Sequence, residues 1–417
     1  MTAAQQATIL ALPYIDVQHD AMTVFDDITQ GVVAKEDIWI SGYRAGSTSV
    51  HGKVTLEPGA GEASGSRGVS LTPKNGVEVE RIPGGDFPVS FPALSIGPTT
   101  VKFPRQVIHP PYPRPKSTTP PLHINALAYS ARKNLLAVAG PDGFLCILPA
   151  GMQEGKEGIK VFKGHVGDAL DVKFFPSGEV ILSASSDLSL RIWGLDTSNP
   201  RTLRGHTRGI TCTTIIGVGK QILSGSRDGT VRLWTVGEAK EVRKWTMEGR
   251  VPVEEILLDE TGEVVLVFKA DGSVQVLRIS GEELGELKSP KGAEGKLVSA
   301  AWDRGRGLVA VGYTTGVIHL REVSLAADKV EVGREAMVRR NEAAVYSLAW
   351  TSEGDLLVGT AAGLPCRLGV RMTAEGIEVG VKEEMAGWEA VGVEAWAVAE
   401  DGGVWCAGGE GGIRRYH

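Results

Sequence analysis

The sequence predicts an all-β protein on three observations. Glycine supplies 54 of the 417 residues, about twice its usual share of ~7%, and its spread along the chain suggests many tight turns. Short runs in which apolar and polar residues alternate are typical of half-buried strands, and no helical periodicity interrupts residues 123–417. The third observation is an internal repeat of about 45 residues, which also predicts the architecture.

Two complete copies of this repeat are Gly164–Trp193 and Gly205–Trp234. Each begins with Gly-His, continues through two short strands to an aspartate turn, and ends in a third strand that closes with tryptophan. The histidine-to-aspartate spacing is 22 residues and the aspartate-to-tryptophan spacing is 6 in both copies. Both segments resemble the WD repeat, which implies that each copy forms one four-stranded blade of a β-propeller.

Weaker copies continue the period through the rest of the chain. Each has a hairpin turn at the corresponding place, followed by an alternating strand such as TVRLW or SVQVLRI. The seven turn positions, spaced by 41 to 48 residues, are Gly143, Leu188, Gly229, Gly272, Gly316, Gly363 and Gly411. We therefore expect a seven-bladed WD-repeat β-propeller preceded by a small β-rich N-terminal domain.

The last repeat is incomplete, because the chain stops at IRRYH, just after its third strand. A ring with an open edge invites aggregation, so a strand from elsewhere is expected to complete the seventh blade. The candidate is Thr99–Ile108, in which Pro104 is acceptable because this strand would be the outermost one.

Three regions are predicted along the chain. Residues 1–82 lack the repeat but contain strand-like runs at Ile38–Ile40 and Val50–Val54, and are expected to form the small β-rich domain. Residues 83–121 hold 11 of the 21 prolines, including the closing strand at about 99–108, and are expected to be an extended connector. Residues 122–417 are expected to form the propeller.

Within the two complete repeats, a set of polar residues corresponds to the hydrogen-bonded tetrad of WD repeats. The two predicted tetrads are His165, Ser183, Asp187 and Trp193, and His206, Ser224, Asp228 and Trp234. Although histidine, serine and aspartate also form catalytic triads, a triad is expected once, at a pocket, and not once per blade, so a structural role is predicted. Blades four to seven lack most of this tetrad, so their stability is expected to depend more on apolar packing.

A narrower resemblance is carried by Lys173–Gly178 (KFFPSG), Leu188–Trp193 (LSLRIW) and Ser198–His206 (SNPRTLRGH), with further similarity at Ile38–Val54. These segments resemble the WD-repeat proteasomal ATPase-associated factors, whose fungal equivalent is an assembly chaperone of the proteasome regulatory particle. The resemblance is strong over about 75 residues of blades two and three, partial over the N-terminal segment and faint beyond residue 240.

This resemblance implies a non-enzymatic binding protein. Its client would be the C-terminal domain of a free proteasomal AAA+ ATPase subunit, held during assembly of the regulatory-particle base, with other base-assembly chaperones as indirect partners. It further implies a protein of the cytoplasm and the nucleus that is monomeric when free. No cofactor is expected.

Charge patterning indicates where a protein partner would bind. The net charge is −6, yet residues 123–240 carry +4 and residues 241–417 carry −9, which favours a basic partner for the later blades. A solvated surface that keeps the protein soluble is the alternative explanation. The candidate partner-binding residues, chosen by their places near blade loops, are Asp168, Arg208, Glu254, Glu255, Glu294, Glu342 and Glu389.

Other classes of function are less well supported by the sequence. The chain lacks the basic stripe of a nucleic-acid binder, any stretch of about 18 apolar residues that would cross a membrane, and any HxH or HExxH spacing. An enzyme with a site in the central channel is therefore disfavoured. A substrate receptor or scaffold for a ubiquitin ligase or chromatin complex stays open as the alternative. The scattered cysteines Cys146, Cys212, Cys366 and Cys406 are expected to be reduced core residues of an intracellular protein.

Overall fold

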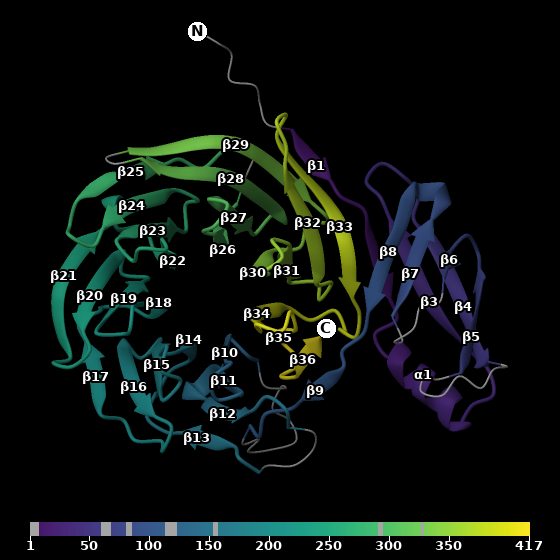
Figure 1. Cartoon of the computed structure of the whole chain (residues 1–417), viewed down its shortest axis with the longest axis horizontal. Helices are drawn as coiled ribbons and strands as arrows, with labels where there is room; N and C mark the ends of the chain where they lie inside the picture. Colours follow the sequence, from purple (N-terminus) through teal and green to yellow (C-terminus); the bar gives the residue numbers. More distant parts are fainter. Residues whose placement is uncertain are drawn as a thin grey trace, which may run out of the picture.

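The computed structural model describes residues 8–59, 68–80, 86–112, 123–152, 157–290, 295–326 and 329–417. Seven four-stranded blades form a ring, and a second β-rich unit lies beside it (Figure 1). The predicted seven-bladed propeller is therefore confirmed. Among the described residues, no helix is long and apolar enough to cross a membrane.

Blades 1 to 4 are antiparallel sheets whose strands follow chain order from the channel outward. Their strands are β10 (Ala126–Ser130), β11 (Leu135–Ala139), β12 (Leu145–Pro149) and β13 (Lys160–Phe162) in blade 1; β14 (Ala169–Phe174), β15 (Val180–Ser185), β16 (Ser189–Gly194) and β17 (Arg201–Arg204) in blade 2; β18 (Ile210–Ile216), β19 (Gln221–Ser226), β20 (Thr230–Thr235) and β21 (Lys240–Thr246) in blade 3; and β22 (Val253–Leu258), β23 (Val264–Lys269), β24 (Val274–Arg278) and β25 (Glu283–Leu287) in blade 4. Two short 3-10 turns, η2 (Pro141–Gly143) and η3 (Glu248–Arg250), lie between strands of this region.

Blades 5 to 7 follow the same order but also pair with strands from the N-terminal quarter of the chain. Their own strands are β26 (Leu297–Asp303), β27 (Leu308–Tyr313), β28 (Val317–Ala326) and β29 (Lys329–Arg339) in blade 5; β30 (Val345–Trp350), β31 (Leu356–Thr360), β32 (Cys366–Met372) and β33 (Ile377–Met385) in blade 6; and β34 (Val393–Val398), β35 (Val404–Gly408) and β36 (Ile413–Tyr416) in blade 7. The added strands β1 (Ile9–Ala11) and β8 (Ile96–Lys102) pair in parallel with β29 and β33, and β9 (Gln106–Ile108) pairs antiparallel with β36.

The seventh blade is closed by β9, which lies within the range 99–108. Thr99–Lys102, which was expected to be part of the same closing strand, belongs to a different strand, β8. Strand β8 pairs with β7 (Phe87–Phe91) and, on its other side, with β33 of blade 6. The expectation of an extended connector over 83–121 is therefore wrong for residues 87–102, which are part of the N-terminal domain. Residues 113–122 lie outside the described part of the chain.

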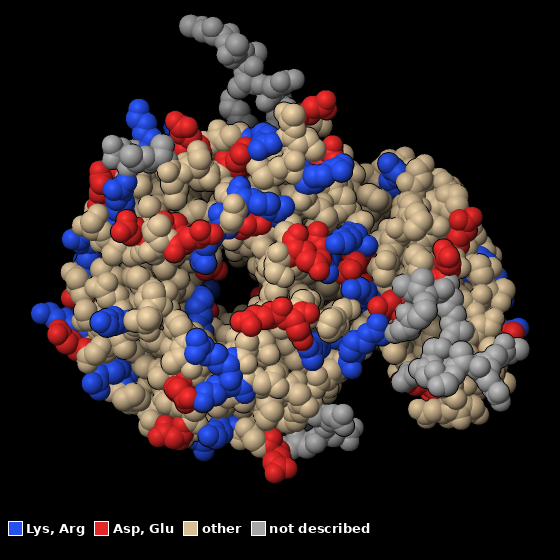
Figure 2. Space-filling model, in the orientation of Figure 1, with Lys and Arg blue, Asp and Glu red and all other residues tan. Residues whose placement is uncertain are grey.

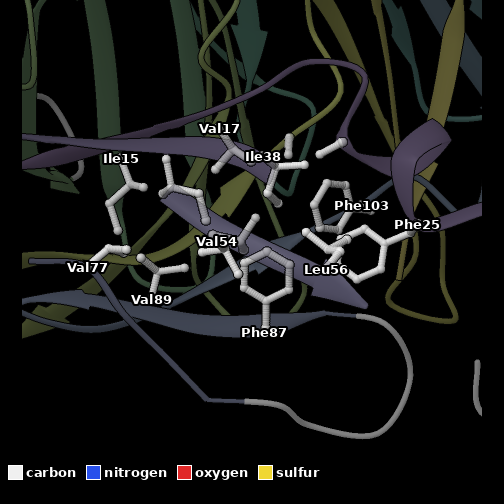
Figure 3. Packing of buried hydrophobic residues seen from close by; sticks show 14 of the residues in the cluster. Ile15, Val17, Phe25, Ile38, Val54, Leu56, Val77, Phe87, Val89 and Phe103 are labelled. Carbon is white, nitrogen blue, oxygen red and sulfur yellow. The ribbon is translucent and has the colours of Figure 1, made fainter. Parts of the chain in front are cut away.

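The N-terminal domain contains two sheets and one helix. The remaining elements are β2 (Tyr14–Val17), α1 (Ala21–Gln30), β3 (Glu36–Tyr43), β4 (Val50–Pro58), β5 (Val69–Lys74), β6 (Glu78–Val79) and the 3-10 turn η1 (Pro92–Leu94). Strands β2 to β5 form one sheet, and β6 and β7 extend blade 6 through β8. Side chains from both sheets and from α1 meet in one apolar core, in which Phe25 of the helix lies near Phe87 and Phe103 (Figure 3).

The sequence predicted strands in the N-terminal region and did not predict helix α1. Its buried residues Ala21, Val24, Phe25 and Ile28 have the spacing of one helical face. The helix ends at Gly31, whose left-handed backbone (φ 74°) receives no steric penalty because glycine lacks a Cβ.

The backbone conformation explains why glycine recurs at the turn positions. Every glycine at the seven turn positions has a φ between 67° and 84°, and at Gly229 a Cβ would lie 2.5 Å from the backbone of Arg250. Leu188 occupies the same left-handed conformation with φ 67°. The period seen in the sequence therefore marks the hairpin between the second and third strands of each blade.

Neighbouring blades are joined near the channel. A side chain in or beside the inner strand of one blade donates a hydrogen bond to a carbonyl oxygen in the inner strand of the next blade. These hydrogen bonds are Asn125 Nδ2 to Ala169 O (2.9 Å), Thr211 Oγ1 to Val253 O (2.6 Å), Ser299 Oγ to Val345 O (2.6 Å) and Ser347 Oγ to Val393 O (2.7 Å). These bonds join blades 1 and 2, 3 and 4, 5 and 6, and 6 and 7, and they help to hold the blade loops in fixed positions.

Blades 4 to 7 contain buried polar contacts as well as apolar packing, which the sequence did not predict. Lys269 pairs with Glu286 in blade 4, and Arg367 pairs with Asp355 in blade 6. In blade 7 the indole of Trp388 donates to Tyr416 Oη (3.0 Å). The four cysteines are buried and free, as expected.

The N-terminal domain is held to the propeller by a buried ion pair. Arg340, just after β29, places Nη2 at 2.6 Å from both carboxylate oxygens of Glu384 in β33. Glu384 Oε1 also accepts a hydrogen bond from the backbone N–H of Ile15 in β2 (3.0 Å), and Arg340 lies over the ring of Tyr14. One carboxylate therefore connects blade 5, blade 6 and the N-terminal domain.

Candidate protein-binding face

Both predicted tetrads are present in the structure with nearly identical geometry. In blade 2, His165 Nδ1 lies 2.9 Å from Asp187 Oδ2, and its Nε2 lies 2.7 Å from Ser183 Oγ. The same hydroxyl accepts a hydrogen bond from the indole N–H of Trp193 (2.8 Å). Blade 3 repeats these contacts through His206, Asp228, Ser224 and Trp234, with distances of 2.9, 2.7 and 2.8 Å.

The chemistry of the tetrads suits structural support. Ser183 is fully buried, and its hydroxyl is engaged by both His165 and Trp193, so a substrate has no access to it. Burial lowers the pKa of His165 and favours the neutral imidazole. Although burial opposes the shift, hydrogen bonds from Ser189 and His165 lower the pKa of Asp187 to about 2, so this carboxylate is charged at neutral pH.

Replacing Ser183 by alanine is expected to lower the free energy of unfolding by about 2–3 kcal/mol, because both His165 and Trp193 would lose a buried hydrogen-bond partner. Urea denaturation monitored by tryptophan fluorescence measures this loss. The control is Ser198→Ala in the exposed turn of the same blade, where the serine caps Asp196 and a loss below about 1 kcal/mol is expected. Equal losses in the two variants would contradict the structural role of the tetrad.

The tetrads also define one face of the ring. The backbone N–H of Val166 donates to Asp187 Oδ2 (3.2 Å), and that of Thr207 donates to Asp228 Oδ2 (2.9 Å). Loops that lead into the inner strands therefore contact the hairpins between second and third strands. We call the surface formed by these loops and hairpins the tetrad face. Val166, at the centre of one such loop, is 90% exposed.

A β-bulge begins the inner strand in six of the seven blades. Each bulge leaves one residue out of the ladder, and such a residue can present its side chain in a new direction. The six residues are Leu170, Thr211, Glu254, Val298, Tyr346 and Glu394. They lie next to the tetrad-face loops, so a ring of varied side chains surrounds this mouth of the channel. Sequence reasoning found only Glu254 among them, because a bulge leaves no mark in the alternation pattern.

The structure places four predicted partner-binding residues in exposed tetrad-face loops. They are Asp168, Arg208, Glu342 and Glu389. Asp168 Oδ1 accepts a hydrogen bond from the backbone N–H of Asp142 (3.1 Å), so part of its role is local. The backbone N–H of Glu389 donates a hydrogen bond to Glu410 Oε1 (2.8 Å), and the side chain of Glu389 is exposed. Glu294 lies outside the described residues.

The remaining two predicted residues, Glu254 and Glu255, differ from the expectation of loop charges. Both lie within strand β22 and are half-buried. Burial raises the pKa of Glu255 to about 7, against the opposing effect of Lys173. Lys173 Nζ in turn lies 3.0 Å from Asp171 Oδ2 and donates to Thr213 O (2.5 Å). Glu255 thus belongs to an internal group at the inner strands and is a poor candidate for a partner contact.

Carboxylates gather on the tetrad face of blades 6 and 7. Glu342 and Glu389 have exposed side chains there, and Glu394 lies beside Tyr346 across Gly392. A hydrogen bond with Glu394 raises the pKa of His123, whose Nε2 lies 3.4 Å from the carboxylate. Other carboxylates of the later blades are in ion pairs, such as Glu322 with Arg334, and are not free to contact a partner in the same way.

Both signs of charge lie around the open channel on the face turned to the viewer in Figure 2. On this face, the later blades do not present one continuous acidic surface. Among the described residues, no group of three or more His, Cys, Asp or Glu is arranged to hold a metal ion. These features fit a rigid, charged platform for protein contacts.

Comparison with known proteins supports the repeats. The family model "WD domain, G-beta repeat" matches residues 156–194 and 198–235. Each match covers the outer strand of one blade and the three inner strands of the next, which are those of blades 2 and 3. The chain is 48% identical over 62 residues to the 26S proteasome regulatory subunit RPN14 of Saccharomyces cerevisiae, a match covering 15% of each protein.

Other relatives are matched over longer but less similar regions. The small ribosomal subunit protein RACK1 of Caenorhabditis elegans is 25% identical over 174 residues, or 39% of this chain and 53% of the relative. The angio-associated migratory cell protein of Canis lupus familiaris is 22% identical over 216 residues, or 48% of each. The chain thus spans between 15% and 53% of the length of these relatives. It carries WD repeats, and its fold is a seven-bladed β-propeller.

Proposed function

We propose that this protein is a non-enzymatic assembly chaperone of the proteasome regulatory-particle base, acting in the cytoplasm and the nucleus. It would bind the C-terminal domain of a free AAA+ ATPase subunit through the tetrad face. The observation that carries this proposal is the 48% identity, over 62 residues, with a yeast protein named as a regulatory subunit of the 26S proteasome. That similarity adds to the resemblance of Lys173–Gly178 and Ser198–His206 to the proteasomal ATPase-associated factors.

The proposed contact is electrostatic and lies on blades 6 and 7. Glu342 and Glu389 are exposed on neighbouring blades, which are joined by the hydrogen bond from Ser347 Oγ to Val393 O. A cationic surface on the ATPase domain would meet these carboxylates without reshaping the propeller. Glu254 is less suitable, because it is half-buried and near Arg227 and Lys296, so its replacement would also disturb the fold.

Reversing both charges by Glu342→Lys and Glu389→Lys is expected to weaken binding of isolated ATPase subunits by about tenfold without lowering the melting temperature, because like charges would then face each other. Affinity capture of individually expressed ATPase subunits, followed by titration, measures the change. The matched control is Glu260→Lys with Glu400→Lys, two exposed glutamates in the turns between first and second strands of blades 4 and 7.

Unchanged affinity in the Glu342 and Glu389 variant would contradict the proposed contact. Failure to capture any ATPase subunit would contradict the chaperone function. Capture of cullin adaptors or histones in their place would support the alternative of a ubiquitin-ligase or chromatin scaffold.

A further inference from the structure

A second charged surface lies on the tetrad face of blades 3 to 5, opposite in sign to the carboxylates of blades 6 and 7. It consists of the exposed residues Arg208, Arg227, Arg250 and Lys296, which we call the basic patch. Each precedes an inner strand or lies in an adjacent hairpin, so the patch follows the curve of the channel mouth. Arg208 is the one member that the sequence singled out.

Contacts between the loops hold the arginines of the basic patch together. Ser226 Oγ donates to the carbonyl oxygen of Arg208 (3.0 Å), and the backbone N–H of Arg227 donates to Gly209 O (3.0 Å). The backbone of Arg250 lies against Gly229, where an added Cβ would be only 2.5 Å away. The three arginines therefore project from neighbouring, mutually braced loops.

Many arginines of the propeller have an ion-pair partner. Arg306, Arg334 and Arg367 are in ion pairs with Asp303, Glu322 and Asp355. In contrast, no ion pair within the described residues involves a member of the basic patch. Exposed, unpaired guanidinium groups that project from braced loops are well suited to bind carboxylates in a bidentate manner.

One carboxylate lies among these cations. Glu254 occupies the bulge of β22 and is half-buried. Burial raises its pKa, whereas Arg227 and Lys296 lower it, so both cations are near enough to act on it electrostatically. A partner that covers the basic patch must therefore accommodate a negative group as well as several positive ones.

This arrangement discriminates between classes of polyanion. A nucleic acid offers a run of phosphates and no cation, so it would place negative charge over Glu254. An acidic protein segment with one lysine or arginine among its carboxylates matches both signs. The net charge of −6 also disfavours general attraction of polyanions.

We propose that the basic patch docks an acidic protein segment in which carboxylates contact Arg208, Arg227 and Arg250 while one basic side chain contacts Glu254. This surface lies on blades 3 to 5, separate from the Glu342 and Glu389 contact of the proposed function. The tetrad face thus selects a partner surface with two regions of opposite charge.

Fluorescence anisotropy with labelled peptides of about 15 residues tests the proposal in the full-length protein. The probes are a Glu-Glu-Lys-Glu-Glu repeat, an all-glutamate peptide and an oligothymidylate of the same length. The mixed peptide is expected to bind most tightly, and the double variant Arg208→Glu with Arg227→Glu to weaken it by about tenfold or more. The variant Glu254→Gln is expected to remove the preference for the mixed peptide over the all-glutamate one.

The matched control is Lys220→Glu with Lys240→Glu, which makes the same charge change at exposed lysines of blade 3 outside the tetrad face. Equal weakening by this control, or tighter binding of the oligothymidylate than of the mixed peptide, would overturn the proposal. Neither result would affect the ATPase contact, which is tested by Glu342 and Glu389. Conversely, failure of ATPase capture would leave the peptide result standing.

Discussion

Replacing Glu384 by leucine is expected to lower the free energy of unfolding by about 3–5 kcal/mol, because Arg340 would keep a buried charge without a partner. Both side chains are almost fully buried, at 3% and 4% exposure. The substitution also removes the acceptor for the backbone N–H of Ile15, so the first strand of the N-terminal domain loses a contact with the propeller. Thermal and urea unfolding measure the loss, and limited proteolysis shows whether the N-terminal domain becomes more accessible.

The double variant Arg340→Met with Glu384→Leu separates the ion pair from the packing around it. When both charges are replaced by apolar side chains of similar size, no buried charge is left unpaired, and stability is expected to recover by about 2 kcal/mol or more over Glu384→Leu alone. If the double variant is as unstable as the sum of the two single variants, the ion pair does not account for the loss. Arg340 would then act mainly through its contacts with Leu364 and Tyr14.

Replacing Ile108 by aspartate is expected to lower the free energy of unfolding by about 4 kcal/mol and to promote aggregation. Ile108 is 1% exposed and is the partner of Ile413 in the pairing of β9 with β36. A carboxylate there would be buried among apolar side chains, so the cost is relieved only if β9 leaves the seventh blade. The ring would then have an unpaired edge. Urea denaturation and light scattering measure the two effects.

The adjacent residue provides the control for this prediction. Val107 lies in the same strand, opposite Arg414, but is 41% exposed. Val107→Asp places the same charge in β9 without burying it, and a loss below about 1 kcal/mol is expected. Similar losses in the two variants would mean that burial of Ile108 is not what holds the seventh blade closed.

The propeller was predictable because its period is set by local backbone chemistry. Turn glycines such as Gly229 and Gly316 occupy left-handed conformations that disfavour other residues, so the spacing of the blades is visible in the sequence. The complete tetrads were also visible, because the contacts of His165 and His206 recur at fixed spacing within one blade.

The N-terminal domain was harder to predict, because its pairing partners are distant in the sequence. Prolines 88 and 98 suggested an extended connector, yet both lie in strands, β7 and β8. The neighbouring strand β6 is only two residues long, so most of β7 is an edge where a missing N–H is tolerated. Helix α1 was missed because its apolar face is short and follows directly after the alternating strand β2.

For the candidate site, the sequence indicated loop positions but not which charged groups are paired. Loop positions such as Glu342 and Glu389 follow from the repeat, whereas ion pairing does not. The pair of Glu384 with Arg340 and that of Asp355 with Arg367 take one charge of each sign out of reach of a partner, through contacts that only the folded chain creates. The same reason explains why the basic patch, whose cations stay unpaired, was not recognised as a unit.

Three N-terminal strands, β1, β8 and β9, pair with strands that lie among residues 329–417. Ile9 pairs beside Met337, Thr100 beside Glu383, and Ile108 opposite Ile413. Blades 1 to 4 need no such partner and can form as they leave the ribosome. Because contacts between residues far apart in the sequence form slowly, these N-terminal strands keep unpaired edges until the later blades have been synthesised.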